Sequence, residues 1–435
     1  MAEPSPAPFT SPLAESLATD LLARFGRYVR VGTQSDRDSD TQPSSARQLD
    51  LQRVLVDDLL ALGLDDARLD EHGYVTATLP ATIDAADGPV PVIGLIAHVD
   101  TSPDAPGDGV EPIVHRLYDG GVLELPRGGT VLDPEQMPDL RNHVGHDLVT
   151  SSGDTLLGAD DKSGVAAILT AVAHLIAHPE LPRPTLRLAF TPDEEIGFGT
   201  RKFDVEAFGA LCAYTVDGSE LGELQDETFS GAQAVVEIEG HDVHPGFATG
   251  KLVNAVRLAA QVVAALPADR TPERTSGRDG FIHVFDVHGS AAHATIRAIL
   301  RDFDDALLAE HGDLLRRTVE EVVGREPKAR ATVEITPQYP NMRSYVDEFP
   351  LVTEAAEQAL RAEGIEPLRS AVRGGTDGSQ LSAAGLPTPN LFTGGHEFHS
   401  VREWASVQEM AAAAATVVRL AEVWTTPDYR AATRG

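Results

Sequence analysis

Apolar runs that end abruptly on acidic residues and histidines recur in the first half of the chain. The run "VPVIGLIAHVD" (residues 90–100) ends at His98 and Asp100, and "TLRLAFTPDEE" (185–195) ends on a pair of glutamates. A strand that is apolar along its whole length is buried on both faces, as in a sheet with helices on either side. These runs restrict the chain to folds in which a sheet is buried and polar groups gather where strands end.

Helical patterns alternate with the strand patterns. The segment "KSGVAAILTAVAHLIAH" (162–178) has the apolar character of a covering helix, and amphipathic patterns span residues 13–30 and 407–424. Alternating strands and helices indicate an α/β fold. We expect residues 13–220 and 339–435 to form one such domain.

The pattern changes between residues 221 and 338. Half-exposed strands with alternating polarity and amphipathic helices replace the continuous apolar runs there. This change predicts a separate α+β domain inserted into the first one. Residues 1–12 are rich in proline, and we expect them to form a disordered tail.

The charge balance excludes several classes of partner. The 35 lysines and arginines stand against 67 aspartates and glutamates, which gives a formal net charge of -32. Such a field repels nucleic acid and anionic membrane surfaces, and it attracts cations. No apolar stretch approaches the roughly 20 residues of a membrane span, and the N-terminus lacks the pattern of a signal peptide. The lone Cys212 fits a reducing compartment, so we expect a cytoplasmic protein.

Polar clusters follow the predicted strands of the α/β domain at corresponding places. Open α/β sheets bind ligands beyond the carboxyl ends of their strands, so we expect these clusters to converge on one crevice. Their acidic and histidine members are His98, Asp100, Asp160, Asp161, Glu194, Glu195, Asp217, His396 and His399.

So many carboxylates in one crevice would repel one another and take up protons. A divalent cation removes that conflict, and two cations remove it better. Imidazole and carboxylate ligands together suit zinc, cobalt or manganese rather than calcium. Each cluster alone has a structural explanation, such as a helix cap or a turn. Only their combination indicates a metal centre.

Several long motifs carry a family resemblance. The segments "HVDTSPD", "TLLGADDKSGVAAILTA", "TPDEEIG", "VHPGFATGKLVNA" and "RGGTDGSQLSAAGLPTPNLFTGG" resemble the M20 family of di-zinc peptidases, and in particular its tripeptide aminopeptidase branch. The similarity runs from about Leu13 to Ala421. It implies a catalytic domain with a mixed sheet, an inserted lid and dimerisation domain, a homodimer, and a small peptide as substrate.

The resemblance also implies two Zn²⁺ per subunit, with Co²⁺ or Mn²⁺ as substitutes. Asp160 would bridge both metals. The family has a glutamate four residues after its last histidine ligand, and "HSVRE" places Glu403 four residues after His399, so His399 is preferred over His396. The implied ligands are His98, Asp160, Glu195, Asp217 and His399.

Two further acids have implied roles in catalysis. Glu194 would act as the general base beside a metal-activated water, because a carboxylate that binds metal, such as Glu195, is no longer a free base. Asp100, two residues after His98, would orient the ligand imidazole and raise its basicity.

Four residues have implied roles in substrate binding. His244, in "VHPG", resembles the histidine of the lid domain that polarises the scissile carbonyl. Arg343 and Arg373 would hold the C-terminal carboxylate of the peptide through their planar guanidinium groups. Asn390 would hydrogen-bond to the peptide backbone.

The sequence therefore predicts a zinc aminopeptidase that releases the N-terminal residue of tripeptides. A second hypothesis is another M20 amidohydrolase, either a dipeptidase or an N-acyl amino acid deacylase. A third is a dimeric homologue without catalytic activity, which the presence of every implied ligand and of the base disfavours.

Overall fold

A computed structural model describes residues 7–432 of the chain. The chain divides into two compact units. Unit 1 contains Met1–Asp226, Tyr345–Ser370 and Ala384–Gly435, and unit 2 contains Glu227–Ser344 and Ala371–Ala383. The predicted role of residues 221–338 as a lid and dimerisation domain stays a prediction.

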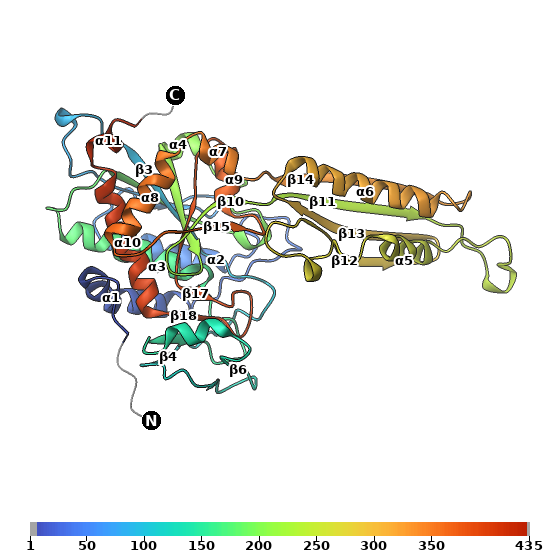
Figure 1. Cartoon of the computed structure of the whole chain (residues 1–435), viewed down its shortest axis with the longest axis horizontal. Helices are drawn as coiled ribbons and strands as arrows, with labels where there is room; N and C mark the ends of the chain where they lie inside the picture. The colour runs from blue at the N-terminus through green and yellow to red at the C-terminus, as the bar shows by residue number, and fades with distance from the viewer. Residues whose placement is uncertain (1–6, 433–435) are drawn as a thin grey trace. The chain divides into compact units, whose positions relative to one another are not determined.

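An eight-stranded mixed sheet forms the centre of unit 1 (Figure 1). Its order is β1 (Arg68–Leu69), β2 (Val75–Leu79), β8 (Thr185–Thr191), β3 (Val92–His98), β9 (Cys212–Gly218), β16 (Asn390–Phe392), β10 (Glu223–Thr228) and β15 (Leu368–Val372). Strands β8, β3, β9 and β16 are parallel to their neighbours in this series, whereas β2 pairs with β8 and β10 pairs with β16 in antiparallel fashion. The predicted α/β fold with a mixed sheet is confirmed.

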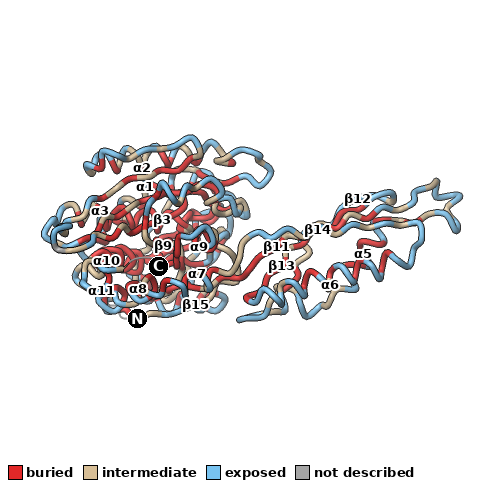
Figure 2. Tube along the Cα trace, turned by 90° about the horizontal axis from the view of Figure 1, so that it is seen from above, coloured by how far each residue is buried: buried red, intermediate tan, exposed pale blue. Residues whose placement is uncertain are grey.

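Small side chains allow the covering helices of unit 1 to pack closely. Helix α3 (Ala159–Ala177) contacts β3 and β9, and α1 (Pro12–Tyr28) and α10 (Val407–Val423) pack against α3. Five consecutive alanines, residues 411–415, are all fully or almost fully buried in α10, which is coloured as buried along most of its length in Figure 2. Helix α8 (Leu351–Ala362) packs on α10, and α2 (Gln48–Ala61) packs on β1 and β2.

The long connection after β3 has structure of its own. It contributes β4 (Ile113–His115), β7 (Leu148–Thr150) and the hairpin of β5 (Leu123–Glu124) and β6 (Val131–Leu132). Strands β17 (Gly395–His396) and β18 (Trp404–Ser406) pair with β7 and β4 in the order β17-β18-β7-β4. This small sheet fixes the segment that carries His396 and His399 against a remote part of the chain.

Unit 2 is a four-stranded antiparallel sheet with helices on one face. The sheet order is β12 (Phe281–Gly289), β13 (His293–Asp302), β11 (Ser230–Glu239) and β14 (Arg330–Tyr339). Helices α5 (Ala255–Ala265) and α6 (Asp305–Val323) pack on it, and their apolar faces share a core with alternate residues of the strands. Helix α6 has an exposed side that is mostly polar (Figure 2), which is the reason its sequence reads as amphipathic. The exposed side of α5 carries Arg257 and Gln261 among alanines and Val256.

The predicted disordered tail, residues 1–12, lies partly outside the described residues, which begin at Ala7. In its described part, the Ala7 N–H donates to the carbonyl of Gly145 at 2.9 Å. The Ser11 hydroxyl caps α1 by accepting from the Ala14 N–H at 3.1 Å, and it also hydrogen-bonds to Glu363.

Helices capable of crossing a bilayer are absent from residues 7–432, since none there combines sufficient length with sufficient apolar character.

The packing of α3 on β9 depends on one glycine, which yields a test of the fold. A Cβ atom on Gly164 would lie 1.8 Å from the carbonyl oxygen of Val216. We expect Gly164→Ala to lower the free energy of unfolding by about 3 kcal/mol or more, because backbone must move to admit the methyl group. In the matched control Gly26→Ala, in α1, the new Cβ would meet only an arginine side-chain atom at 3.4 Å. That variant should be as stable as the parent or slightly more stable. Chemical unfolding measures both, and equal stabilities would contradict the packing described.

Candidate metal centre

Adjacent parallel strands bring the acidic clusters together. Strand β3 pairs with β8 on one side and with β9 on the other, so the carboxyl ends of these strands lie side by side. His98 is the last residue of β3, and Asp217 lies near the end of β9. Glu195 lies in a short 3₁₀ helix (Glu194–Ile196) that follows β8, and Asp160 lies in the first turn of α3.

The Asp160 carboxylate lies between two imidazole rings. Its Oδ1 is 2.9 Å from Nε2 of His98, and its Oδ2 is 3.2 Å from Nε2 of His399. A carboxylate that presents one oxygen to each of two ligand groups has the arrangement of a bridging ligand.

One further carboxylate accompanies each ring. Asp217 Oδ1 lies 3.5 Å from His98 Nε2, and Glu195 Oε2 lies 2.7 Å from His399 Nε2. The structure thus brings all five predicted ligands together, as two groups that share Asp160. His98 is buried, whereas 42% of the His399 side chain is exposed, so the cluster opens to solvent at His399.

Burial and mutual repulsion perturb the protonation of this cluster. Burial raises the pKa of Glu195 to about 8 and the pKa of Asp217 to about 6, and the charge of Asp160 adds to both. Burial by itself lowers the pKa of His399, but hydrogen bonds to Asp160 and Glu195 outweigh it and raise that pKa to about 11. Without a cation, protons must offset the negative charge.

The residues fit a pair of divalent cations. Two imidazoles and three carboxylates are a donor set that zinc, cobalt and manganese accept. The buried Oε1 of Glu195 has no hydrogen-bond partner among the described residues, and a cation would satisfy it. Metal binding would also release the protons that this cluster holds, because metal ligands bind in their deprotonated form.

Asp161 is adjacent to Asp160 but has different contacts. Its Oδ2 accepts the backbone N–H of His98 at 3.2 Å, and its Oδ1 accepts the N–H of Gly164 at 3.1 Å. Burial, together with the charge of Asp217, raises its pKa well above the usual range. Both oxygens of Asp161 therefore hold backbone in place.

Asp100 connects the ligand histidine with the glutamate pair. Its Oδ1 lies 3.3 Å from Nδ1 of His98. The same carboxylate accepts the backbone N–H of Glu194 at 3.0 Å and of Glu195 at 3.2 Å. The orienting role was implied by the resemblance, but the contact with the glutamate turn was not foreseen, because it joins residues 94 positions apart.

The turn that carries the glutamates has a second anchor, which the sequence did not reveal. Asp193 has a positive φ of 59° and is fully buried. Its carboxylate accepts the Ser44 N–H at 2.7 Å and the Gln48 side-chain N–H at 2.6 Å. Only the polar loop before α2 could have suggested such a partner, and nothing in its spacing does so.

His396, the alternative to His399, belongs to a separate buried cluster. Its Nε2 lies 3.1 Å from Glu409 Oε2, and Glu409 Oε1 lies 2.9 Å from Nε2 of His143. His143 Nδ1 lies 2.7 Å from the Asp139 carbonyl oxygen, so this nitrogen donates. Because both nitrogens of His143 face acceptors, the ring is an imidazolium that balances the Glu409 carboxylate, and the cluster needs no cation.

The predicted substrate-binding residue in unit 1, Asn390, has both ends of its amide engaged. The Asn390 oxygen accepts the N–H of Asp217 at 2.9 Å, and the amide nitrogen donates to Gln225 at 2.6 Å. Asn390 therefore fixes the backbone of a predicted ligand.

In unit 2, His244 is exposed at the start of a 3₁₀ helix (Pro245–Phe247), where its Nδ1 accepts the Gly246 N–H at 3.1 Å. A neutral ring that accepts at Nδ1 carries its proton at Nε2.

The two predicted arginines also lie in unit 2 and have local partners. Arg373 donates to the carbonyls of Gly277 and Asp279 at 2.7 and 2.8 Å, and its guanidinium lies over the ring of Phe229. Arg343 Nη1 lies 3.8 Å from Oε2 of Glu227.

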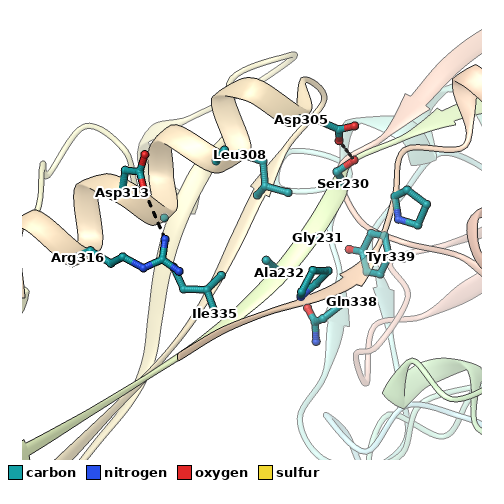
Figure 3. A pocket seen from close by; sticks show the side chains of 14 residues that line it. Ser230, Gly231, Ala232, Asp305, Leu308, Asp313, Arg316, Ile335, Gln338 and Tyr339 are labelled. Atoms are coloured by element: carbon teal, nitrogen blue, oxygen red, sulfur yellow. Dashed lines mark hydrogen bonds and ion pairs between the residues drawn. The ribbon is translucent and has the colours of Figure 1, made fainter. Parts of the chain in front are cut away.

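A cavity of about 500 Å³ in unit 2 contains none of the predicted site residues (Figure 3). It lies between α6 and strands β11 and β14, with Leu308, Ile335 and Tyr339 on its walls. Its acids are paired, Asp305 with Ser230 at 2.6 Å and Asp313 with Arg316 at 3.4 Å. With apolar walls and paired acids, this cavity resembles a groove between packed elements rather than a hydrolytic site.

Comparison with known proteins shows which proteins the chain is similar to. The family model for peptidase family M20/M25/M40 matches residues 155–423. Peptidase T of Bacillus subtilis is 46% identical over 404 residues, which are 93% of this chain and 98% of that protein. Peptidase T of Vibrio parahaemolyticus is also 46% identical, with coverage of 93% and 98%.

Solved structures show the same fold. The crystal structure of aminopeptidase PepT from Bacillus cereus aligns with a TM-score of 0.72 and 25% identity, over 94% of this chain and 99% of that one. A tripeptidase from Staphylococcus aureus aligns with a TM-score of 0.74 and 21% identity, over 93% and 98%.

The two histidine clusters predict different consequences of losing one ring. His399→Ala should lower the Zn²⁺ content of the purified chain and weaken Zn²⁺ binding at least tenfold, because it removes a ligand atom beside Asp160 and Glu195. The matched control His396→Ala should keep its full metal content. Elemental analysis and competition with a chromophoric chelator measure both. Metal loss in His396→Ala alone would reverse the choice of ligand.

The Glu409 cluster predicts a pH-dependent contribution to stability. The bond from His143 overcomes burial and lowers the pKa of Glu409 to about 2, and Glu409 raises the pKa of His143. The Glu409 contribution is complete above its unfolded pKa of about 4.5, and it is lost as pH falls towards 2. The His143 contribution is complete below about 6.5, and it is lost as pH rises through its raised value.

Glu409→Gln should therefore cost most, about 3 kcal/mol, between pH 4.5 and 6.5. Chemical unfolding of the metal-free chain can be followed by the fluorescence of Trp404, whose ring stacks on His396 with 4.0 Å between centroids. The same cost at pH 3, 5.5 and 9 would contradict the charged state assigned here.

Proposed function

Because the chain belongs to peptidase family M20/M25/M40, we propose that it is a metal-dependent aminopeptidase that releases the N-terminal residue of tripeptides. The observation that carries this proposal is the Asp160 carboxylate, with one oxygen directed to His98 and the other to His399. Similarity over almost the whole chain to proteins named Peptidase T supports the substrate class.

The residues would hold two Zn²⁺ ions, for which Co²⁺ or Mn²⁺ can substitute. His98 and Asp217 would hold one ion, Glu195 and His399 the other, and Asp160 both. Such ions would supply Lewis acidity, which lowers the pKa of water towards ~7 and polarises a carbonyl.

Glu194 is the proposed general base. Its backbone N–H is held by Asp100 at 3.0 Å, in the same turn that presents Glu195 as a ligand. The Glu194 carboxylate would accept a proton from the attacking water and deliver it to the nitrogen of the second residue, which becomes the free amine of the remaining dipeptide when the peptide C–N bond breaks. Two adjacent glutamates are needed because a single carboxylate cannot bind metal and exchange protons at the same time.

The substrate-binding residues are proposed from the resemblance and from their local geometry. His244 with its proton at Nε2 is in the form that can donate to a carbonyl oxygen. Arg343 and Arg373 would bind the carboxylate of the peptide, although Arg373 would do so while its other donors hold the loop that contains Gly277 and Asp279. Asn390 would act on the substrate indirectly, through the position of Asp217.

We further propose that the chain works as a homodimer in the cytoplasm. The homodimer follows from the family resemblance and from the inserted domain. The single cysteine, Cys212, is buried in β9, which fits a reducing compartment.

Substrate length and chelation test the proposal. The purified, zinc-loaded chain should release the first residue from a tripeptide with free termini, and a chelator should abolish the release. Di- and tetrapeptides and an N-acetylated tripeptide should react much more slowly, because both ends of the tripeptide are recognised. Equal or faster cleavage of the dipeptide would indicate a dipeptidase, and preference for the acetylated peptide would indicate a deacylase.

Removal of the base should separate catalysis from metal binding. Glu194→Gln should lower kcat by about 10²- to 10⁴-fold, because the attacking water loses its proton acceptor. Its metal content should stay that of the parent. Glu206→Gln, an exposed change in α4 (Val205–Phe208), is the control and should change neither quantity. A kcat within twofold of the parent value for Glu194→Gln would show that another group is the base.

A further inference from the structure

Glu403 is a buried carboxylate outside the proposed ligand set and outside the proposed proton transfer. It directly precedes β18, four residues after His399, and only 1% of its surface is exposed. Burial raises its pKa to about 7, so an ionised Glu403 requires compensation from its neighbours.

Three backbone N–H groups provide that compensation. Oε2 of Glu403 accepts from Leu157 at 2.7 Å and from Gly158 at 2.8 Å, and Oε1 accepts from Asp160 at 3.0 Å. All three donors belong to the segment that leads into α3. Only a carboxylate has enough acceptor positions for them, because a glutamine would direct its own N–H groups at one or more of these donors.

The segment that Glu403 holds leads into α3 but lies before its regular turns. Asp160 and Asp161 have non-helical backbone angles, and Asp161 caps the regular helix locally, because its Oδ1 accepts the Gly164 N–H at 3.1 Å. Gly158, with φ = 80°, has no side chain that could hold the residues before the cap. Glu403, 245 residues away in sequence, holds them instead.

The three hydrogen bonds of Glu403 form a clamp between two segments, and each segment carries a proposed ligand. Residues 399–403 carry His399 at one end and Glu403 at the other, whereas residues 157–160 carry Asp160. Glu403 accepts the backbone N–H of Asp160, and His399 Nε2 lies 3.2 Å from the side chain of Asp160. The separation between these two ligands is thus set through a single short connection.

We propose that Glu403 is a positioning residue for the metal centre: it clamps residues 157–160 so that Asp160 presents one oxygen to each metal group. This role rests on the proposed ligand set. It differs from that of a general structural contact, because it acts on metal affinity and not on stability alone.

A matched pair of substitutions separates these two roles. Glu403→Gln removes the clamp and keeps the volume of the side chain. Glu363→Gln is the control, because Glu363 is equally buried, lies in the same unit, and accepts from the Thr10 hydroxyl at 3.0 Å. Both variants should unfold at a lower temperature than the parent.

The measurement is Zn²⁺ binding by the metal-free, full-length chains in competition with a chromophoric chelator, below the unfolding temperature of every variant. Glu403→Gln should bind Zn²⁺ about 10- to 100-fold more weakly than the parent, as expected for residues that orient ligands. Its activity at low Zn²⁺ should fall, and excess Zn²⁺ should restore it. Glu363→Gln should bind Zn²⁺ as the parent does. Glu403→Asp keeps the charge but has a shorter side chain. Its Zn²⁺ affinity should lie between that of Glu403→Gln and that of the parent.

Three results would overturn the proposal. Parent-like Zn²⁺ affinity in both Glu403 variants would show that the residue is only a structural contact. Equal weakening in Glu403→Gln and Glu363→Gln would show that lost stability explains the effect. A parent chain that binds Zn²⁺ but does not cleave tripeptides would contradict the proposed substrate and leave the role of Glu403 intact. A parent chain that binds no Zn²⁺ would overturn both the proposed function and the proposed role of Glu403.

Discussion

Mutual repulsion among buried carboxylates is the constraint on which the rest of unit 1 depends. Three adjacent parallel strands and the start of α3 bring Asp160, Asp161, Glu195 and Asp217 into one cluster with His98. Burial and mutual repulsion raise the pKa of Glu195, and hydrogen bonds to Asp160 and Glu195 raise the pKa of His399, so without a cation protons would have to balance these charges. A pair of divalent cations balances them better, so the same repulsion that opposes folding without metal favours binding of metal.

Hydrogen-bond partners sort the acids of this region into two groups. Asp160, Glu195 and Asp217 direct oxygens at imidazole nitrogens, as ligands would. The acids Asp100, Asp161, Asp193 and Glu403 instead accept backbone N–H groups. Each of these contacts fixes the main chain of a proposed ligand or of the turn beside it. Four of these seven acids therefore act as scaffold, which explains why acidic motifs here are longer than a metal site alone requires.

The sequence predicted which acidic and histidine residues gather at the strand ends, because this depends on residue type and on where strands end. Apolar runs such as residues 90–97 are strands wherever they can be buried, and parallel neighbours must end on the same side. The long connection after β3 was harder to predict. Its strands are two or three residues long, and one of them, β7, pairs with β18, about 250 residues later in the chain.

The sequence by itself determined the α/β arrangement, the mixture of imidazole and carboxylate groups, and the strand ends that supply them. Residue types and periodicity carry this information locally. Only the tertiary structure decided the contacts of the two histidines: His399, which the family motif already favours as a ligand, has a positive φ of 61° and lies beside Asp160, whereas His396 in β17 pairs with Glu409 of α10. It also decided the roles of Asn390 and Glu403, whose partners lie 173 and 243 residues away. A hydrogen bond depends on distances of a few tenths of an ångström, and such distances exist only after remote segments have packed together.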